Sequence, residues 1–302
     1  MRTLRQAAAA GRRLVKLGLA LVLGAAAVTA TAGDPAAELR AKYDQLRHEL
    51  QDNNFQRPLH IVSSQSGETL RGEVYAVLDH PFNDLSTALK DPSDWCDILI
   101  LPFNTKYCHA VEGSGGAVLQ VRIGRKFDQP VQDAYRVNFG LRQVAATPGY
   151  FESRLNAASG PVGTSDYRIA LAAVPLDKGR TFMHLSYSYS FGAMGRFAMR
   201  AYLATAGADK VGFTVTAKDP GGQPVYIGGV RGAIERNVMR YYLAIDVYLA
   251  SLKSAPDQRV EKRIQTWFNN TERYPRQLRE MDRSTYVAMK RGEHERQQAM
   301  ID

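Results

Sequence analysis

Hydrophobic and polar residues alternate through the middle of the chain with the period of two that is typical of β-strands. Residues 59–64 and 70–78 alternate on either side of Ser66-Gly67, which predicts a β-hairpin. Further strands are predicted near residues 119–127, 135–141, 167–173, 183–191, 211–216 and 225–230. Because short turns join most of these strands, we expect antiparallel neighbours, with one face of the sheet covered.

Helical periodicity flanks this run of strands. The spacing of Leu39, Tyr43, Leu46 and Leu50 predicts a helix over 35–51. A helical stretch beginning at Pro81 is broken at 91–94, where a new helix cap is expected. A further helix is predicted over 193–205. The strongest helix covers 232–253, about 33 Å long, and its apolar positions recur every three or four residues.

The N-terminus has the pattern of a targeting segment. Residues 1–16 are basic, residues 17–30 form an uncharged apolar run, and Ala30-Thr31-Ala32 fits a small-residue cleavage site. This order predicts a cleavable signal peptide over 1–32, and its alanine-rich style suggests a bacterial protein exported to the periplasm. An uncleaved single-pass anchor is the alternative.

The net charge of +9 changes once this segment is set aside. Residues 1–32 contain five basic residues and no acidic one, so the remainder carries 34 basic and 30 acidic residues. A balance of +4 over that length does not indicate nucleic acid as a partner.

The predicted export bears on the state of the two cysteines, Cys96 and Cys108. In an oxidising compartment, a disulfide between them is the favoured interpretation. Two buried thiols are the next alternative. A chemical role for the pair Cys108-His109 is the third, although one such pair lacks the remaining ligands of a closed zinc site.

The order of elements predicts an α+β fold, in which a curved antiparallel sheet is gripped by a long C-terminal helix. Residues 33–57 would form an N-terminal helix, 58–255 the main domain, and 256–302 a helical tail that first docks and then extends into solvent. In residues 73–101, a strand leads into Pro81-Phe82-Asn83 and on to Asp91-Pro92-Ser93-Asp94-Trp95-Cys96. With the element order, this segment resembles the START-like (SRPBCC, helix-grip) superfamily of lipid-binding domains. The helix at 193–205 and the tail depart from that pattern.

The resemblance implies a cavity between sheet and helix that holds a lipid, a sterol or an aromatic ligand. The aromatic-rich inner faces supply the candidate ligand-binding residues, with an ordinary packed core as the alternative. These candidates are Tyr135, Phe139, Tyr187, Tyr189, Phe191, Phe213, Tyr241, Ile245 and Tyr248. Gly192, Met194, Gly195 and Phe197 could form a lid, with transient membrane contact through Arg196 and Arg200. A plain connecting helix is the alternative there.

No catalytic motif is present, and we predict no cofactor and no metal site. The six histidines lack ligand spacing, and the glycine-rich turns lack the residues of a phosphate loop. The favoured function is therefore carriage or sensing of a hydrophobic small molecule or lipid. An enzyme of cyclase or hydrolase type is the first alternative, with Asp246, His184 or Cys108-His109 as its acid or base. An envelope interaction protein that docks through Trp267 and Phe268 is the second.

Overall fold

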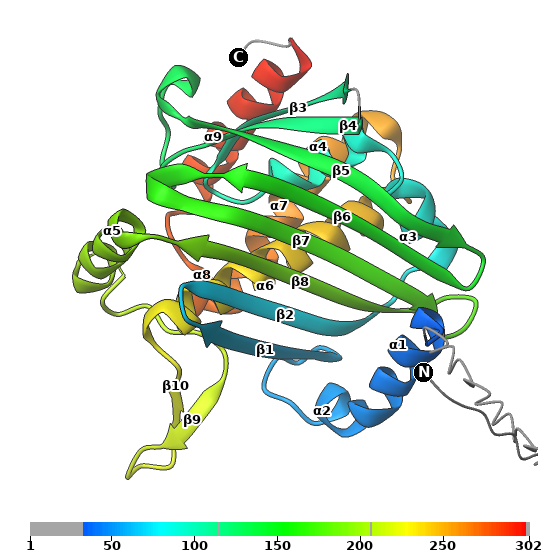
Figure 1. Cartoon of the computed structure of the whole chain (residues 1–302), viewed down its shortest axis with the longest axis horizontal. Helices are drawn as coiled ribbons and strands as arrows, with labels where there is room; N and C mark the ends of the chain where they lie inside the picture. The colour runs from blue at the N-terminus through cyan, green and yellow to red at the C-terminus, as the bar shows by residue number, and fades with distance from the viewer. Residues whose placement is uncertain (1–32, 114, 206, 300–302) are drawn as a thin grey trace, which may run out of the picture. The chain divides into compact units, whose positions relative to one another are not determined.

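Eight antiparallel strands form one sheet in the computed structural model, which describes residues 33–299 except 114 and 206. The predicted signal peptide lies outside the described residues. The strands run across the sheet in the order β1-β2-β8-β7-β6-β5-β4-β3 (Figure 1). Their bounds are β1 Leu59–Ser66, β2 Thr69–Leu78, β3 Thr105–Gly113, β4 Gly116–Ile123, β5 Tyr135–Thr147, β6 Tyr150–Ser159, β7 Thr164–Pro175 and β8 Thr181–Phe191.

A single crossover sets this topology. The hairpin of β1 and β2 turns at Gly67, whose φ of 55° suits glycine. Two short helices, α3 (Phe82–Ala88) and α4 (Pro92–Leu99), then carry the chain to the opposite edge, where β3 begins (Figure 1). The Asp91 side chain caps α4 by accepting a hydrogen bond from the Ser93 backbone N–H at 2.8 Å. The predicted break and new cap are therefore present.

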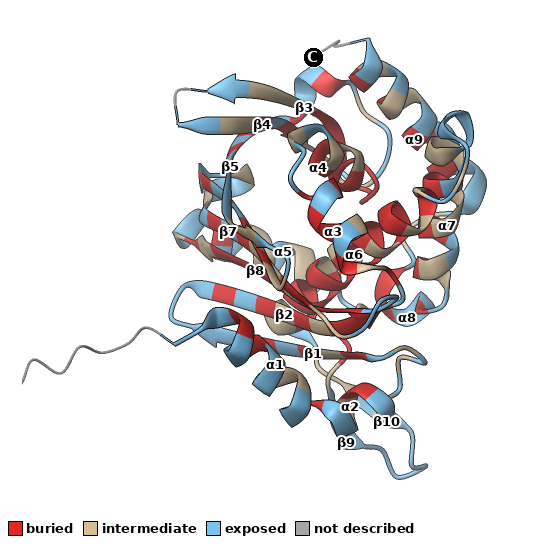
Figure 2. Cartoon of the chain, turned by 90° about the vertical axis from the view of Figure 1, so that its right-hand side faces the viewer, coloured by how far each residue is buried: buried red, intermediate tan, exposed pale blue. Residues whose placement is uncertain are grey.

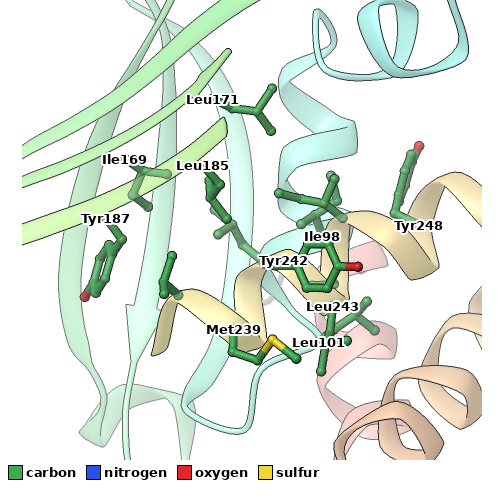
Figure 3. Packing of buried hydrophobic residues seen from close by; sticks show 14 of the residues in the cluster. Ile98, Leu101, Ile169, Leu171, Leu185, Tyr187, Met239, Tyr242, Leu243 and Tyr248 are labelled. Atoms are coloured by element: carbon green, nitrogen blue, oxygen red, sulfur yellow. The ribbon is translucent and has the colours of Figure 1, made fainter. Parts of the chain in front are cut away.

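The long helix α6 (Gly229–Ser251) packs on one face of the sheet, and the sheet curves around it (Figure 2). Gly72 permits this close approach, because a Cβ at that position would lie 3.1 Å from Ile234 Cγ1. Figure 3 shows Leu171 and Leu185 of the sheet directed toward α6. The predicted antiparallel sheet with a long covering helix is confirmed.

A second helical layer covers part of the opposite face, which the prediction of one covered face did not include. The predicted helix 35–51 is divided at Leu46 into α1 (Pro35–Gln45) and α2 (Arg47–Gln51). Leu39 and Leu46 pack with Val174 and Phe182, which project from the sheet away from α6.

Four strand assignments need correction. Residues 211–216 and 225–230 do not join the main sheet; they contribute β9 (Val215–Lys218) and β10 (Pro224–Tyr226), a separate hairpin. The main sheet instead contains β3 and β6, which lack clear alternation. In β3, the first four residues are buried in succession, and the pairing with β4 shifts register between Thr105 and Tyr107. In β6, the inward positions include the polar Ser153 and the small Ala157, which weaken the apolar period.

The C-terminal tail is packed into the protein, so its predicted solvated end is wrong. It forms α7 (Arg259–Glu272), α8 (Pro275–Leu278) and α9 (Arg283–Gln298). Trp267 and Tyr286 are fully buried, with ring centroids 5.3 Å apart. The α9 residues Lys290 and Glu293 are buried as well, and Glu293 pairs with Lys106 of β3. The mixed composition of this helix concealed these buried charges.

A disulfide joins Cys96 of α4 to Cys108 of β3, with a Cα–Cα distance of 5.1 Å. It connects the crossover helix to the edge strand that follows it, so the favoured interpretation of the two cysteines is confirmed. Among the described residues, no helix combines the length and apolar character that a membrane crossing requires.

Candidate ligand-binding pocket

A pocket of about 390 Å³ lies between the sheet, the first half of α6 and the helix α5 (Ala193–Ala204). Its sheet wall comes from β5, β7 and β8. The 3₁₀ turn η2 (Pro161–Gly163) and the loop 124–126 complete its rim. This volume is within the range of pockets that bind drug-sized molecules.

The sheet wall of the pocket is aromatic. The rings of Tyr167 and Tyr189 are stacked with centroids 5.4 Å apart, and Tyr187 lies 5.7 Å from Tyr189. Tyr241 of α6 approaches Tyr187 at 5.4 Å, and Phe139 contacts Tyr167 edge-on at 6.1 Å. Alternation in β8 puts Tyr187 and Tyr189 on the α6 side, so strand geometry positions these rings.

The hydroxyl groups of this wall are the polar part of the site. Tyr167 pairs with Thr164 Oγ1 at 2.7 Å. The hydroxyls of Tyr187, Tyr189 and Tyr241 make no hydrogen bond to another residue in the described part of the chain. Burial raises the pKa of all three, so they are neutral at physiological pH and can donate hydrogen bonds to a ligand.

The opposite end of the pocket is basic. We call Lys126, Arg236 and Arg240 the cationic cluster; all three line the pocket. Glu280 accepts hydrogen bonds from Lys126 Nζ at 2.7 Å and from Arg240 Nη2 at 2.6 Å. The hydroxyl of Tyr202, on α5, accepts from Arg236 Nη2 at 3.2 Å and from Lys126 Nζ at 3.4 Å. These contacts connect the covering helix α5 to the base of the pocket.

Protonation at this end follows burial and local charge. Burial lowers the pKa of the Arg240 guanidinium. Burial alone would raise the pKa of Tyr202, but the charges of Lys126 and Arg236 outweigh it and lower that pKa. Burial would also raise the pKa of Glu280, and its cationic neighbours lower it instead. Glu280 is therefore ionised.

The structure brings part of the predicted ligand set into this pocket. Phe139, Tyr187, Tyr189 and Tyr241 line it, as does Gly195 of the predicted lid. Tyr135 is on the same face of β5 as Phe139, but it is 52% exposed and lies outside the pocket lining. It lines a neighbouring hollow of about 610 Å³ that shares the rim loops with the pocket.

The remaining predicted ligand residues lie in the core away from the pocket lining. Phe213 packs between Phe55 and Tyr274, with centroid distances of 5.6 and 5.5 Å. The ring of Tyr248 lies 4.1 Å from the guanidinium carbon of Arg263. Also buried outside the lining are Phe191 and Ile245. The alternation of residues in the sequence shows which side chains point inward, but it does not distinguish those that pack in the core from those that line a cavity.

The helix α5 covers the pocket, and the two glycines of the predicted lid lie at its start. Gly192 precedes α5 with an ordinary negative φ, and a Cβ on Gly195 would lie 2.9 Å from Phe191 Cβ. Gly195 therefore serves close packing. Met194 and Phe197 are 68% and 75% exposed, so they point to solvent rather than into the pocket.

Sequence reasoning did not select Tyr167, Tyr202 or the cationic cluster as site residues. Tyr167 has the same inward alternation as its neighbours in β7, so that pattern could have selected it. Arg236 and Arg240 are four residues apart in α6 and therefore share a helix face. Two arginines next to an apolar stripe were a usable signal for a charged pocket end.

The predicted acid and base candidates lie outside the pocket lining. Asp246 accepts from Arg57 Nη1 at 2.7 Å and pairs with His80 at 3.0 Å. Cys108 is in the disulfide. Among the described residues that line the pocket there is no Asp, Glu, His or Cys. No group of three or more such side chains that could hold a metal ion occurs in the described ranges.

His184, the remaining candidate, is held on the outer side of the sheet. Its Nε2 pairs with Glu73 at 2.9 Å, and its ring stacks on Tyr75 at 4.3 Å. Burial would raise the pKa of Glu73, but hydrogen bonds from His184 and Arg71 lower it to about 2. This arrangement stabilises the sheet rather than forming part of the pocket.

Comparison with known proteins gives only distant structural likeness. No protein-family model matches the chain, and no curated protein matches it. Solved structures that match include a conserved protein from Geobacillus kaustophilus (12% identity, 60% of this chain and 95% of that chain, TM-score 0.37). Others are the Zhui aromatase/cyclase from Streptomyces (14%, 67% and 96%, 0.34) and a norcoclaurine synthase from Thalictrum flavum (15%, 47% and 89%, 0.34). At these identities and TM-scores, the matches identify no family, ligand or reaction for this chain, whose own coordinates show the helix-grip arrangement of sheet and helix.

Proposed function

We propose that this protein binds a small hydrophobic or aromatic molecule in the pocket between β8, α5 and α6, for carriage or sensing. The observation that supports this most directly is the tyrosine wall. Two buried tyrosines, Tyr187 and Tyr189, and the partly buried Tyr241 line a pocket of about 390 Å³, and their hydroxyls have no hydrogen-bond partner in the described part of the chain.

The alternative, an ordinary packed core, explains this wall poorly. Buried tyrosine hydroxyls usually have a hydrogen-bond partner, because a buried hydroxyl without a hydrogen bond costs about 1–3 kcal/mol. Elsewhere in this protein that rule holds: the hydroxyl of Tyr286 donates to the Leu101 carbonyl at 3.0 Å, and that of Tyr274 donates to the Phe55 carbonyl at 2.7 Å. The hydroxyls of Tyr187, Tyr189 and Tyr241 can therefore hydrogen-bond to a ligand whose apolar part contacts the tyrosine rings.

Export to the periplasm is part of the proposal. It is supported by the order of basic, apolar and small residues in 1–32. The Cys96–Cys108 disulfide suits the same oxidising compartment. We also propose that the protein belongs to the START-like superfamily, because of the strand order of its sheet and the covering helix α6.

One observation favours an enzyme as the second candidate. Tyr202 lines the pocket, and its neighbours Lys126 and Arg236 lower its pKa against the effect of burial. A tyrosine in such a setting can serve as an acid or base. In that case Tyr202→Phe would abolish turnover of a ligand while leaving its binding intact.

Native mass spectrometry of the protein, purified without detergent, tests the proposal. We expect a co-purifying small molecule, which organic extraction would release for identification. Titration with the neutral fluorophore N-phenyl-1-naphthylamine then measures the affinity of the emptied pocket.

Tyr187→Phe, Tyr189→Phe and Tyr241→Phe remove the free hydroxyls one at a time. Each should alter the ligand found in the purified protein or weaken its binding by roughly tenfold. Tyr150→Phe is the matched control, because its hydroxyl bonds Glu152 on β6 outside the pocket lining. If all four variants bind the purified ligand and the fluorophore like the parent protein, the pocket is not the binding site.

A further inference from the structure

The cationic cluster carries more positive charge than its surroundings neutralise. Lys126 and Arg240 share one carboxylate, Glu280. Lys210 lies near the same group and adds a fourth cation; burial lowers its pKa. In the described part of the chain, Glu280 is the one carboxylate that contacts the cluster, so three cations lining the pocket face a single negative charge.

Arg236 is the clearest case of a charge without a counterion. It is 2% exposed, and both of its hydrogen-bond partners are neutral: the Val211 carbonyl and the Tyr202 hydroxyl, each at 3.2 Å. Its Nε has no hydrogen-bond partner among the described residues, and neither does the Nε of Arg240. A buried cation without a paired anion is costly to keep, so such a site favours binding of an anion from outside.

The position of the charge relative to the rings suggests the shape of the ligand. Arg240 precedes Tyr241 in α6, so the cluster and the tyrosine wall meet along one helix. The pocket therefore offers an apolar, hydroxyl-bearing end and a basic end within one cavity. Guanidinium groups bind carboxylate and phosphate oxygens with strong, charge-assisted hydrogen bonds.

We infer that the ligand is an anionic amphiphile, whose carboxylate or phosphate group binds Arg236, Arg240 and Lys126 while its apolar body lies against Tyr187, Tyr189 and Tyr241. This inference rests on the proposed function. It also gives Tyr202 a role: the hydroxyl that now accepts from Arg236 and Lys126 lies beside the anion, so α5 covers the head of the ligand.

Two fluorophores with nearly the same ring system separate the inference from the proposed function. N-phenyl-1-naphthylamine is neutral, and 8-anilino-1-naphthalenesulfonate adds one anionic group to that body. We expect the anionic probe to bind the emptied protein at least tenfold more tightly at low salt, and to lose most of that advantage in high salt.

The variants Arg236→Gln and Arg240→Gln should each weaken binding of the anionic probe by roughly tenfold or more and leave the neutral probe within twofold. Lys126→Gln, at a half-buried loop position, should act in the same direction and does not depend on repacking α6. Arg200→Gln is the matched control, since Arg200 is exposed on α5 and does not line the pocket. Circular dichroism melting checks that each variant is folded.

Competition distinguishes the sources of the anion. Dodecanoate should displace the anionic probe, whereas dodecanol and inorganic phosphate alone should do so only at concentrations at least tenfold higher. Displacement by inorganic phosphate at the same concentration as dodecanoate would overturn the inference of an amphiphile.

Tight binding of the neutral probe, with no preference for the anionic one and no effect of Arg236→Gln, Arg240→Gln or Lys126→Gln, would also overturn it. That result would leave the proposed function standing. If neither probe binds, both proposals fail.

Discussion

The docking of the C-terminal helix α9 depends on one buried carboxylate. Glu293 Oε1 accepts a hydrogen bond from Lys106 Nζ of β3 at 3.0 Å, and Oε2 accepts from Lys290 Nζ at 2.6 Å. The side chains of Lys106 and Glu293 are 0% exposed and that of Lys290 is 1% exposed. Glu293→Gln keeps the shape of the side chain and removes its charge, so two buried ammonium groups lose their shared counterion.

The cost follows from this burial. Breaking a buried ion pair by removing one partner destabilises proteins by about 3–5 kcal/mol. For a domain of this size, that corresponds to a fall in Tm of roughly 10 °C. Burial already lowers the pKa of Lys290 to about 8 despite the nearby Glu293. The variant should lower it further, and part of the cost is then relieved by deprotonation at alkaline pH.

Urea unfolding followed by tryptophan fluorescence measures this loss, because Trp267 is buried and its ring stacks on Tyr286 of α9. The control is Glu261→Gln, which removes the exposed ion pair between Glu261 and Arg291 in the same tail. That pair should contribute less than about 1 kcal/mol. Equal losses for the two variants would refute the reasoning that burial makes Glu293 the anchor of α9.

Three further outcomes are expected. Replacing Cys96 and Cys108 together by Ala should lower the free energy of unfolding by about 3 kcal/mol. Dithiothreitol should lower the Tm of the parent protein but leave the Tm of this variant unchanged. A parent protein whose Tm does not change on reduction would contradict this prediction. The folded-state pKa of Glu73 is about 2, below its ordinary value of 4.5, so its contribution to stability is present above pH 4.5 and lost as the pH falls toward 2. In urea titrations, the free energy of unfolding of Glu73→Gln should therefore be lower than that of the parent protein at pH 6, and the two should converge near pH 2. Gly72→Val should cost roughly 1–3 kcal/mol, because the added atoms overlap Ile234 of α6, and an unaffected Tm would show that α6 does not lie as close to β2 as described.

The sequence predicted those elements whose hydrophobic period is set by one covered face. Alternation in β2 and β8 and the three-and-four spacing of α6 belong to this class, as does the capped break before α4. It could not predict β3, because Lys106 lies at an irregularity of the pairing with β4 and is buried by its contact with Glu293 of α9. A bulge interrupts the alternation that marks a strand in the sequence.

For the site, the sequence identified the inward faces, and from them Phe139, Tyr187, Tyr189 and Tyr241. It did not separate these from Phe213 and Tyr248, which have the same local pattern but pack into the core. Whether an inward aromatic ring meets another side chain or a cavity depends on residues distant in sequence, here α5 and the loop 124–126.

Local physics, acting through residues adjacent or one turn apart, thus determined from the sequence alone which segments form strands and helices and which faces turn inward. Only the tertiary structure decided where the interior contains a pocket and where charged side chains come together in it. In the sequence, the spacing of Arg236 and Arg240 shows that they share one face of a helix, but not what that face meets. They become the basic end of a pocket because β8, α5 and the loop before η1 (Val131–Asp133) meet around them, and such meetings are set by packing across the whole chain.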